Sequence, residues 1–437
     1  MYKKTVILFV LLAVCCAADG QTFFTSLEDV WKYADSHNVQ IRIAEYELDK
    51  GVYAKKQSYL ALLPSVGVTG SFTDNTSLQT TLIPAVIFGG PAGTYQTVQF
   101  GQKYIYAGGL SAQMDIINVQ TWFNMRIAKE TEELNKASLA NQKKSTYQQI
   151  ATQYYSYLLS KEAARLAASS AAVADSIYQS VNNKFAEGTV SMANVDVAKL
   201  NSERVQQTNI TAQYQMQTAK NSLKGLLNLS VSDSLEINAA LQSNMNTPAT
   251  AAFAQDPAVT LASYQSKVNL SQYKYANANF LPTLNVLYSN SQQQNDNTFE
   301  PFQGGPAWYP ARFWSLRATW NIFTGGTRWL QSQKSRINYR ESQLQLESAQ
   351  KQSAINDENL RLSYMRTTAL LSKTENVMKL SLDNYHHISN RYETGLGTIE
   401  DRLAAFKDYI DYQNQYLNSL SDMLVQLYQI KIRQQSF

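Results

Sequence analysis

The feature that most constrains the fold is a pair of very long segments without proline. One runs from Trp122 to Gly188 and the other from Trp329 to Gly395, each a span of 66 residues. Proline breaks helix interiors, so nothing in either segment interrupts a helix. At 1.5 Å per residue, an unbroken helix of this length is roughly 100 Å long. Globular helices average only about 11–12 residues, so the sequence predicts long helices of the coiled-coil kind.

These segments belong to an internal repeat. Matching positions in the two halves are Leu63-Pro64 with Leu281-Pro282 (218 apart), and Trp122 with Trp329 and Gly188 with Gly395 (both 207 apart). We therefore predict a duplicated unit of about 200 residues. The expected organisation is a signal peptide at 1–20, a first helix-strand-strand-helix repeat at 21–229, a connector at 230–256 and a second repeat at 257–437.

The last helix predicted from the pattern has apolar residues alternating by three and four, which is heptad spacing. The stripe consists of Leu403, Phe406, Ile410, Gln413, Leu417, Leu420, Leu424 and Leu427. A second stripe runs beside it, through Ala405, Tyr409, Tyr412, Tyr416 and Met423. Two seams on one helix indicate neighbours on both sides, as in a ring of helices. A large helical bundle with a tyrosine-rich core is the alternative.

Strands are predicted between the Leu-Pro elements and the tryptophans. We expect them at 65–72 and 283–289, with return strands near 103–117 and 312–323. In the last of these, one face is apolar and aromatic and the other is polar, so the apolar face lies either in a soluble core or against lipid. The 11 extra residues of the first repeat fall within about 76–102, whose glycines and prolines favour a loop over a strand.

The first 20 residues predict a secretory signal. Lys3 and Lys4 precede a short apolar stretch, and Ala18 to Gly20 fits a small-residue cleavage site. Both cysteines, Cys15 and Cys16, lie in this segment, so we expect no disulfide in the mature protein. Lipidation of one of these cysteines is the alternative.

Composition and motifs exclude several classes of protein. The 27 tyrosines are too many for a disordered chain, and a net charge of +4 with scattered basic residues does not indicate a nucleic-acid partner. The adjacent His386 and His387 lack the i,i+4 spacing of a helical zinc site. No nucleophile or phosphate-loop motif is present. We therefore predict no enzyme activity, no metal site and no cofactor.

Five segments, in order along the chain, resemble the TolC-type outer-membrane efflux family (outer membrane factors). They are SLEDVWKYADSHNVQIRIAEYELDKGVYAKKQSYLALLP, NSLKGLLNL, the stretch 230–256, ATWNIFTGG at 318–326 and RYETGLGTIEDRLAA at 391–405. The first looks like the family's opening helix with its Leu-Pro exit into the strands. The last looks like the turn of a periplasmic helical hairpin.

The resemblance implies an α+β membrane protein that forms a homotrimer. Four strands per chain would make a 12-stranded β-barrel in the lipid of the outer membrane, continued by a long α-helical coiled-coil barrel in the periplasm. It implies a passive exit duct of a tripartite efflux or type I secretion system, docked to a periplasmic adaptor (membrane fusion) protein and an inner-membrane pump. The alternative is a periplasmic coiled-coil adaptor or structural protein without a membrane barrel.

The resemblance also assigns roles to residues near the hairpin turns. Asp401 matches an aspartate that rings the periplasmic entrance in some members, and Tyr392 matches a tyrosine that tethers the closed tip. Asn194 stands where the usual acidic partner of that tyrosine would be, and Ala404 replaces a second aspartate, so the lock is expected to be built differently. A solvated carboxylate on the outer surface is the other interpretation of Asp401.

Adaptor docking is the role expected for the turns themselves. The residues concerned are Gly188, Thr189, Gly395 and Leu396. Glycine suits such turns because it adopts positive φ without strain.

Overall fold

The structure is a computed structural model of the 437-residue chain and describes residues 22–239, 241, 252–299 and 308–437. The expected signal peptide with Cys15 and Cys16, and the central part of the expected connector, lie outside the described residues. The chain divides into two compact units. The helical unit comprises 1–49, 135–263 and 345–437, and the sheet unit comprises 50–134 and 264–344.

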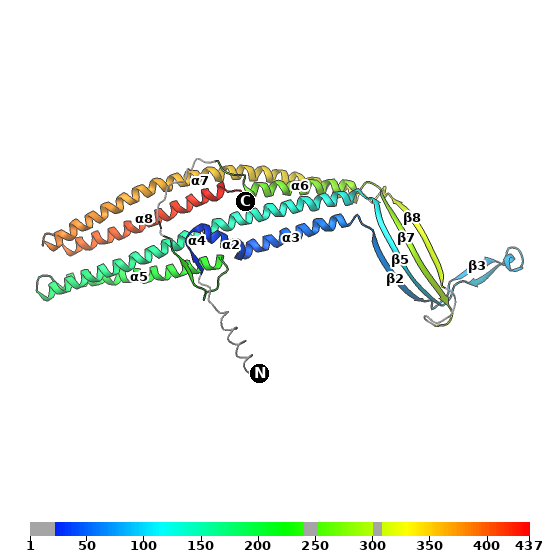
Figure 1. The fold of residues 1–437 in the computed structure, drawn as a ribbon, viewed down its shortest axis with the longest axis horizontal. Coiled ribbons are helices and arrows are strands. Elements are labelled where there is room, and N and C mark those ends of the chain that lie inside the picture. Colours follow the sequence, from blue (N-terminus) through cyan, green and yellow to red (C-terminus); the bar gives the residue numbers. More distant parts are fainter. Residues whose placement is uncertain (1–21, 240, 242–251, 300–307) are drawn as a thin grey trace, which may run out of the picture. The chain divides into compact units, whose positions relative to one another are not determined.

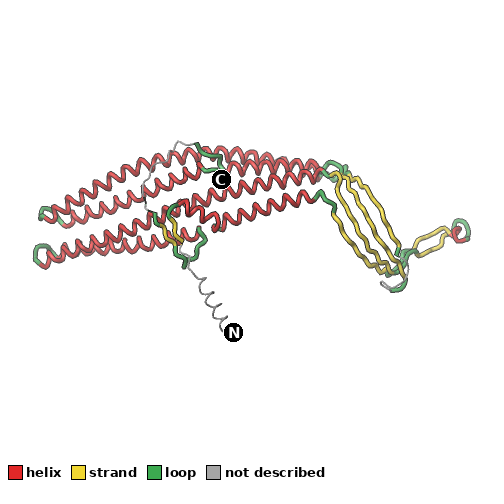
Figure 2. The backbone as a smooth tube through the Cα atoms, in the orientation of Figure 1, coloured by secondary structure: helices red, strands yellow, loops and turns green. Residues whose placement is uncertain are grey.

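Helices and strands follow one another in an order that is nearly the same in the two halves of the chain (Figures 1 and 2). In chain order they are β1 (Thr22–Phe24), α2 (Leu27–His37), α3 (Val39–Leu60), β2 (Ser65–Asp74), β3 (Thr80–Pro84), η1 (Ala85–Phe88), β4 (Tyr95–Gln99), β5 (Tyr104–Ile117), α4 (Val119–Ala186), α5 (Met192–Leu226), β6 (Leu235–Ile237), α6 (Pro257–Ala278), β7 (Thr283–Asp296), β8 (Tyr309–Thr319), α7 (Thr327–Glu393) and α8 (Ile399–Gln434).

The two long helices predicted from the proline-free segments are confirmed. Helix α4 has 68 residues and α7 has 67. The opening helix is different from the expectation, because it is divided at Asn38 into α2 and α3. The Asn38 side chain accepts hydrogen bonds from the backbone N–H groups of Gln40 and Ile41 and so starts α3 as a cap. Among the described residues, no helix is both long and apolar enough to cross a bilayer.

The sheet unit contains a four-stranded antiparallel sheet in the order β2-β5-β7-β8 (Figure 1). All four predicted strands are present, with β7 running further, to Asp296, than expected. The last one, β8, begins earlier than expected, at Tyr309, and ends at Thr319, so the predicted strand residues 320–323 lie outside it. The loop predicted at 76–102 is wrong in part, because β3 and β4 form an antiparallel hairpin there. Three of the four residues at 80–83 are β-branched, which favours strand, and Pro84 is the last residue of β3. The glycines and Pro91 that suggested a loop lie in the turn beyond it, where Gly89 has a φ of 76°.

The core of the helical unit is built around α8 and the middle of α4. The heptad prediction is confirmed at Leu403, Phe406, Leu417, Leu420, Leu424 and Leu427, which are all buried. Trp31 on α2 stacks on Tyr147 of α4 at 5.0 Å between ring centroids. The short strands β1 and β6 pair in parallel at the edge of this core, joining the start of the described chain to the segment after α5.

Candidate functional site

The two helical hairpins of the helical unit end in turns with the same backbone. Gly188 and Gly395 both have a φ of 76°, the left-handed region that favours glycine. Around Gly188, the N–H of Thr189 donates to the Lys184 carbonyl at 2.9 Å. Around Gly395, the N–H of Leu396 donates to the Arg391 carbonyl at 2.8 Å. Both turns are therefore Schellman motifs, which satisfy the last carbonyls of α4 and α7.

The returning helices also start in a similar way. Ser191 caps α5 by accepting a hydrogen bond from the Asn194 N–H, and Thr398 caps α8 by accepting one from the Asp401 N–H at 3.1 Å. In the first hairpin the Asn194 carboxamide oxygen also accepts from the Ser191 N–H, which completes a capping box. These local signals explain why each hairpin reverses at these residues.

The ends of the two hairpins pack on one another in a single apolar cluster. Its buried members are Ala171, Ala174, Ile177, Val181, Val195, Ala198, Val205, Tyr392, Ile399, Leu403 and Phe406, from α4, α5, α7 and α8. Tyr392 is only 7% exposed, and its hydroxyl makes no hydrogen bond within the described residues. The predicted tether is thus a buried ring at the contact between the hairpins.

Two cations lie against the Tyr392 ring and share one carboxylate. The Lys184 ammonium is 4.3 Å from the ring centroid, and the Arg402 guanidinium carbon is 5.2 Å from it. Glu393 pairs with Arg402 at 2.7 Å and with Lys184 at 3.5 Å. Because Lys184 belongs to the first hairpin and the other three residues to the second, this tip cluster (Lys184, Tyr392, Glu393 and Arg402) ties the hairpins together.

The predicted gate residues are close in sequence to the tip cluster but do not join it. Asn194 makes its side-chain hydrogen bonds with Ser191 and, at 3.5 Å, with Glu400 on α8; it makes none with Tyr392. The Asp401 side chain is exposed, and its carboxylate has no hydrogen bond or ion pair in the described part of the chain. The structure therefore does not pair Tyr392 with Asn194.

Lys184, Glu393 and Arg402 were missed by the sequence analysis. The repeat contains a signal for part of the cluster, because Lys184 and Tyr392 occupy neighbouring positions before two equivalent turns. Helix ends at equivalent turns of packed hairpins lie side by side. This would place Lys184 and Tyr392 near one another. Nothing in a single sequence predicts that Glu393 pairs with both Lys184 and Arg402.

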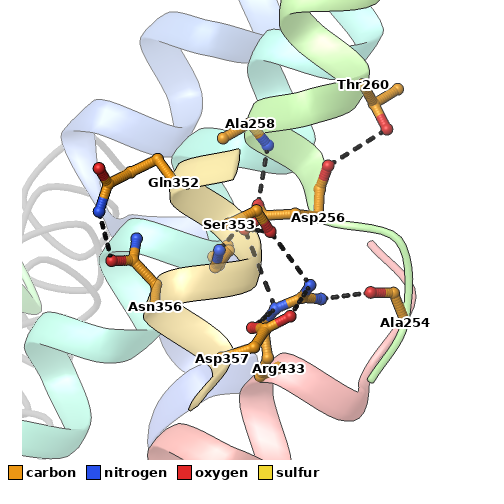
Figure 3. Close-up of polar contacts among 10 residues, drawn as sticks. Ala254, Asp256, Ala258, Thr260, Gln352, Ser353, Asn356, Asp357 and Arg433 are labelled. Carbon is orange, nitrogen blue, oxygen red and sulfur yellow. Dashed lines mark hydrogen bonds and ion pairs between the residues drawn. The ribbon is translucent and has the colours of Figure 1, made fainter. Parts of the chain in front are cut away.

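A second polar centre, which we call the junction cluster, lies where α6 begins and α8 ends (Figure 3). The Arg433 guanidinium makes two hydrogen bonds to the Asp357 carboxylate on α7, at 2.7 and 2.9 Å. It also donates to the Ala254 carbonyl. Bidentate pairs of this kind are among the stronger charge-assisted contacts. The Arg433 side chain is only 8% exposed.

Asp256 forms the other half of the junction cluster. It caps α6 by accepting from the Ala258 N–H at 3.0 Å, and it accepts from the Lys144 ammonium at 2.8 Å and the Ser353 hydroxyl at 3.0 Å. Burial alone would raise the pKa of Asp256, but these hydrogen bonds and the charge of Lys144 outweigh it, so the pKa lies below its ordinary value. The cluster thus joins α4, α6, α7 and α8 through buried charges.

Residues 32–229 match the family model described as outer membrane efflux protein. This match covers α3 to α5 and most of α2, and it includes the first hairpin tip. The matched segment makes up less than half of the 437 residues. No curated protein sequence matches the chain.

Solved structures of outer-membrane proteins share the fold. VceC of Vibrio cholerae is 17% identical with a TM-score of 0.73, and the match covers 92% of this chain and 95% of that one. For Campylobacter jejuni CmeC the identity is 15% and the TM-score 0.71, with 93% and 85% covered. For MtrE of Neisseria gonorrhoeae, solved in an open state, the values are 16% and 0.71, with 92% and 88% covered. At these identities the likeness shows the fold alone.

The matched family model and the shared fold agree with the resemblance seen in the sequence. At the hairpin tips, as at the junction cluster, helices from the two halves of the chain meet through charged side chains.

Proposed function

We propose that the protein is an outer-membrane efflux channel that extends into the periplasm. We further propose that it is a homotrimer, in which three four-stranded sheets join edge to edge into a 12-stranded β-barrel and the hairpins form a helical barrel. The observation that carries the proposal is the pair of sheet edges. Strands β2 and β8, of 10 and 11 residues, each have one side without a strand partner among the described residues, and nearly all their side chains are exposed. Long exposed edges pair with other strands, and closure into a ring leaves no edge unpaired.

Cysteine cross-linking tests this arrangement. We expect single cysteines scanned along β2, combined with Ser315→Cys on β8, to give trimers on oxidation for at least one pair. Both natural cysteines lie in the expected signal peptide, so the mature chain should contain none and the background of unintended disulfides is low. Variants with a cysteine on β2 alone are the control. Monomers in every combination would contradict the trimer.

We further propose that the chain is a duplication with the boundaries expected from sequence: 21–229, a connector at 230–256, and 257–437. The order of elements supports this, since α3-β2-β5-α4-α5 and α6-β7-β8-α7-α8 repeat one pattern. The matching Schellman turns and caps of the two hairpins support it as well.

The hairpin tips are the proposed contact with a periplasmic adaptor protein, which links the channel to an inner-membrane pump. The exposure of the two turns supports this role: Gly188, Thr189 and Gly395 are exposed, and Leu396 is 72% exposed. An exposed leucine on a rigid turn offers an apolar contact to a partner helix.

Substitution of the turn glycines tests the docking role. A Cβ at either position meets nothing within 4 Å, so an added side chain projects outward. Gly188→Asp and Gly395→Asp should abolish export while the channel stays assembled. Gly188→Asn and Gly395→Asn are matched controls, because asparagine tolerates the left-handed conformation and adds no charge. Normal export in both aspartate variants would remove the tips from the docking surface.

For the gate we propose that Asp401 of three chains forms a ring of like charges at the periplasmic entrance, with Tyr392 and Asn194 holding the tip closed. The free Asp401 carboxylate supports this, whereas Glu400 is already occupied by Asn194. Rings of carboxylates select cations. In planar bilayers Asp401→Asn should reduce cation selectivity and block by divalent ions, and Glu400→Gln should leave both nearly unchanged. Unaltered selectivity and block in Asp401→Asn would show that Asp401 lies outside the gate.

A further inference from the structure

A cavity of about 540 Å³ lies on the sheet unit, over strands β2 and β5. Its floor is formed at Gly70 and Gly108, and its walls include Phe72, Tyr106, Phe299 and Trp308. None of the described residues that line it is charged. Its volume falls within the roughly 300–1,000 Å³ typical of ligand pockets.

The two floor glycines have no local structural reason to be glycine. They are direct cross-strand partners. Neither has a positive φ; a Cβ at Gly70 would meet nothing within 4 Å, and one at Gly108 only the Thr69 carbonyl at 3.8 Å. The neighbouring Gly109 is different, because its Cβ would lie 2.7 Å from the Ser291 side chain. Glycine within a strand costs about 0.5–1 kcal/mol relative to alanine. Glycine without a packing constraint often marks a place where a ligand approaches the backbone.

The aromatic wall is held in place by a specific turn at the end of β7. Asp296 accepts hydrogen bonds from both the N–H and the hydroxyl of Thr298, at 3.0 Å each. This turn directs Phe299 back over the sheet, where its ring packs edge-on against Phe72 at 5.8 Å and Tyr104 at 5.5 Å. Phe299 and Phe72 nevertheless remain 61% and 51% exposed. The wall is therefore ordered but uncovered.

The cavity lies where an apolar face of the sheet ends. Alternate residues of a strand share a face, and along β2 this face carries Val66, Val68, Gly70, Phe72 and Asp74. Val66 and Val68 are 64% and 80% exposed. Directly beyond the cavity the same face of the sheet becomes polar. Asp74 and Asp296 lie there, on either side of Tyr104, as its two cross-strand partners.

We propose that this cavity binds a hydrocarbon chain of an outer-membrane lipid, near the end of the chain that adjoins the headgroup. This inference rests on the proposed outer-membrane location, because large exposed apolar side chains on a membrane sheet face lipid. The described lining residues are uncharged and mostly apolar, with Gln292 and Gln294 beside them on β7 as the cross-strand partners of Gly108 and Tyr106. The open glycine floor lets a hydrocarbon chain lie directly on the backbone. The step from valines to aspartates marks the level where hydrocarbon gives way to headgroups.

Native mass spectrometry of the purified, full-length channel tests the proposal, with phosphatidylethanolamine as the probe added to delipidated protein in detergent. Gly70→Leu and Gly108→Leu fill the floor and should weaken lipid retention at least tenfold. Gly67→Leu is the matched control, since it lies on the opposite face of the same strand and its Cβ also meets nothing within 4 Å. Equal retention in wild type and both filled variants would overturn the proposal.

Two further measurements keep the test decisive. Phe299→Ala removes an exposed wall ring without altering a strand, and should reduce retention even if a leucine variant does not assemble. A single-chain lysolipid should compete for the site, and soluble glycerophosphoethanolamine should not. Competition by the headgroup alone would replace the hydrocarbon chain with a polar ligand. Export is measured on the same variants and should stay unchanged, which separates this site from channel function.

Discussion

The junction cluster and the tip cluster are both networks of charged side chains that join helices of the same unit, but they differ in exposure. At the junction, Arg433 and Asp256 have side chains that are 8% and 7% exposed. At the tip, the central Glu393 side chain is 50% exposed, although Arg402 is only 12% exposed. The junction network is largely shielded from water, whereas the shared carboxylate of the tip cluster is open to it.

This difference indicates different tasks. A buried ion network is strongly destabilising to break, because one partner is left without its counter-charge. A network centred on a solvated carboxylate contributes little to stability, because water replaces the lost partner. The junction therefore suits a permanent connection, and the tip suits a contact that opens and closes.

The largest expected effect is at the junction. Arg433→Met leaves the partly buried Asp357 without its bidentate partner and the buried Asp256 without one of its two cations, and should lower the free energy of unfolding by about 3–5 kcal/mol. Chemical denaturation followed by tryptophan fluorescence measures this. The control is Arg433→Met combined with Asp357→Leu, which removes both charges and should recover much of the loss. A change below about 0.5 kcal/mol in the single variant would contradict the buried-network interpretation.

The second effect concerns the pH dependence of stability. The pKa of Asp256 is below its ordinary 3.8 in the folded protein, so this carboxylate contributes stability above pH 3.8 that is lost as the pH falls through the folded-state pKa. The difference in Tm between wild type and Asp256→Asn should be constant above about pH 5 and shrink at lower pH. A difference that grows on acidification would reverse the sign of the linkage. The Asp256→Asn change should leave the tip cluster unaffected.

A smaller effect on stability is expected at the tip. Glu393→Gln removes both ion pairs and should cost at most about 1 kcal/mol. The functional effect is larger, because the hairpins lose their charged connection and the closed tip opens more often. Single-channel recordings should show a higher open probability, and Glu393→Asp should restore part of the closed state. An unchanged open probability in Glu393→Gln would mean that the tip cluster does not hold the channel closed.

The smallest effect is expected for an ion pair on one exposed helix surface. Lys379 pairs with Glu375 at 2.7 Å within α7, and both side chains are well exposed. Lys379→Gln should leave unfolding and conductance without measurable change, which provides the baseline for the tip variants. A clear loss in either measurement would show that exposed charges on α7 matter more than their solvation suggests.

Much of the architecture could be predicted from sequence because it depends on periodic or local signals. The absence of proline predicted α4 and α7, and heptad spacing predicted the buried stripe of α8. The positive φ of Gly188 and Gly395 followed from turn chemistry alone. The hairpin of β3 and β4 was missed because glycine and proline at its tip were taken to describe the whole segment.

The polar clusters were not predictable in the same way. Arg433 and Asp357 are 76 positions apart, and Lys184 and Glu393 lie in different halves of the chain. No spacing rule connects such residues, since their contact depends on how separate helices pack. The roles of Asp401 and Asn194 came from resemblance, and the Asn194 hydrogen bonds with Ser191 and Glu400 are visible only in three dimensions.

The parallel pairing of β1 with β6 has a consequence for the order in which the chain folds. Thr22 pairs with Leu235, so the first strand has no partner until more than half of the chain has been made. The same core needs Ile430 and Ile432, which are fully buried near the very end of the sequence. The helical hairpins close through contacts near in sequence and are expected to form early, because local contacts carry a smaller entropic cost. Strand β1, which is synthesised early, is thus expected to be among the last elements to pack into the fold. It remains exposed to proteases and chaperones until synthesis is complete.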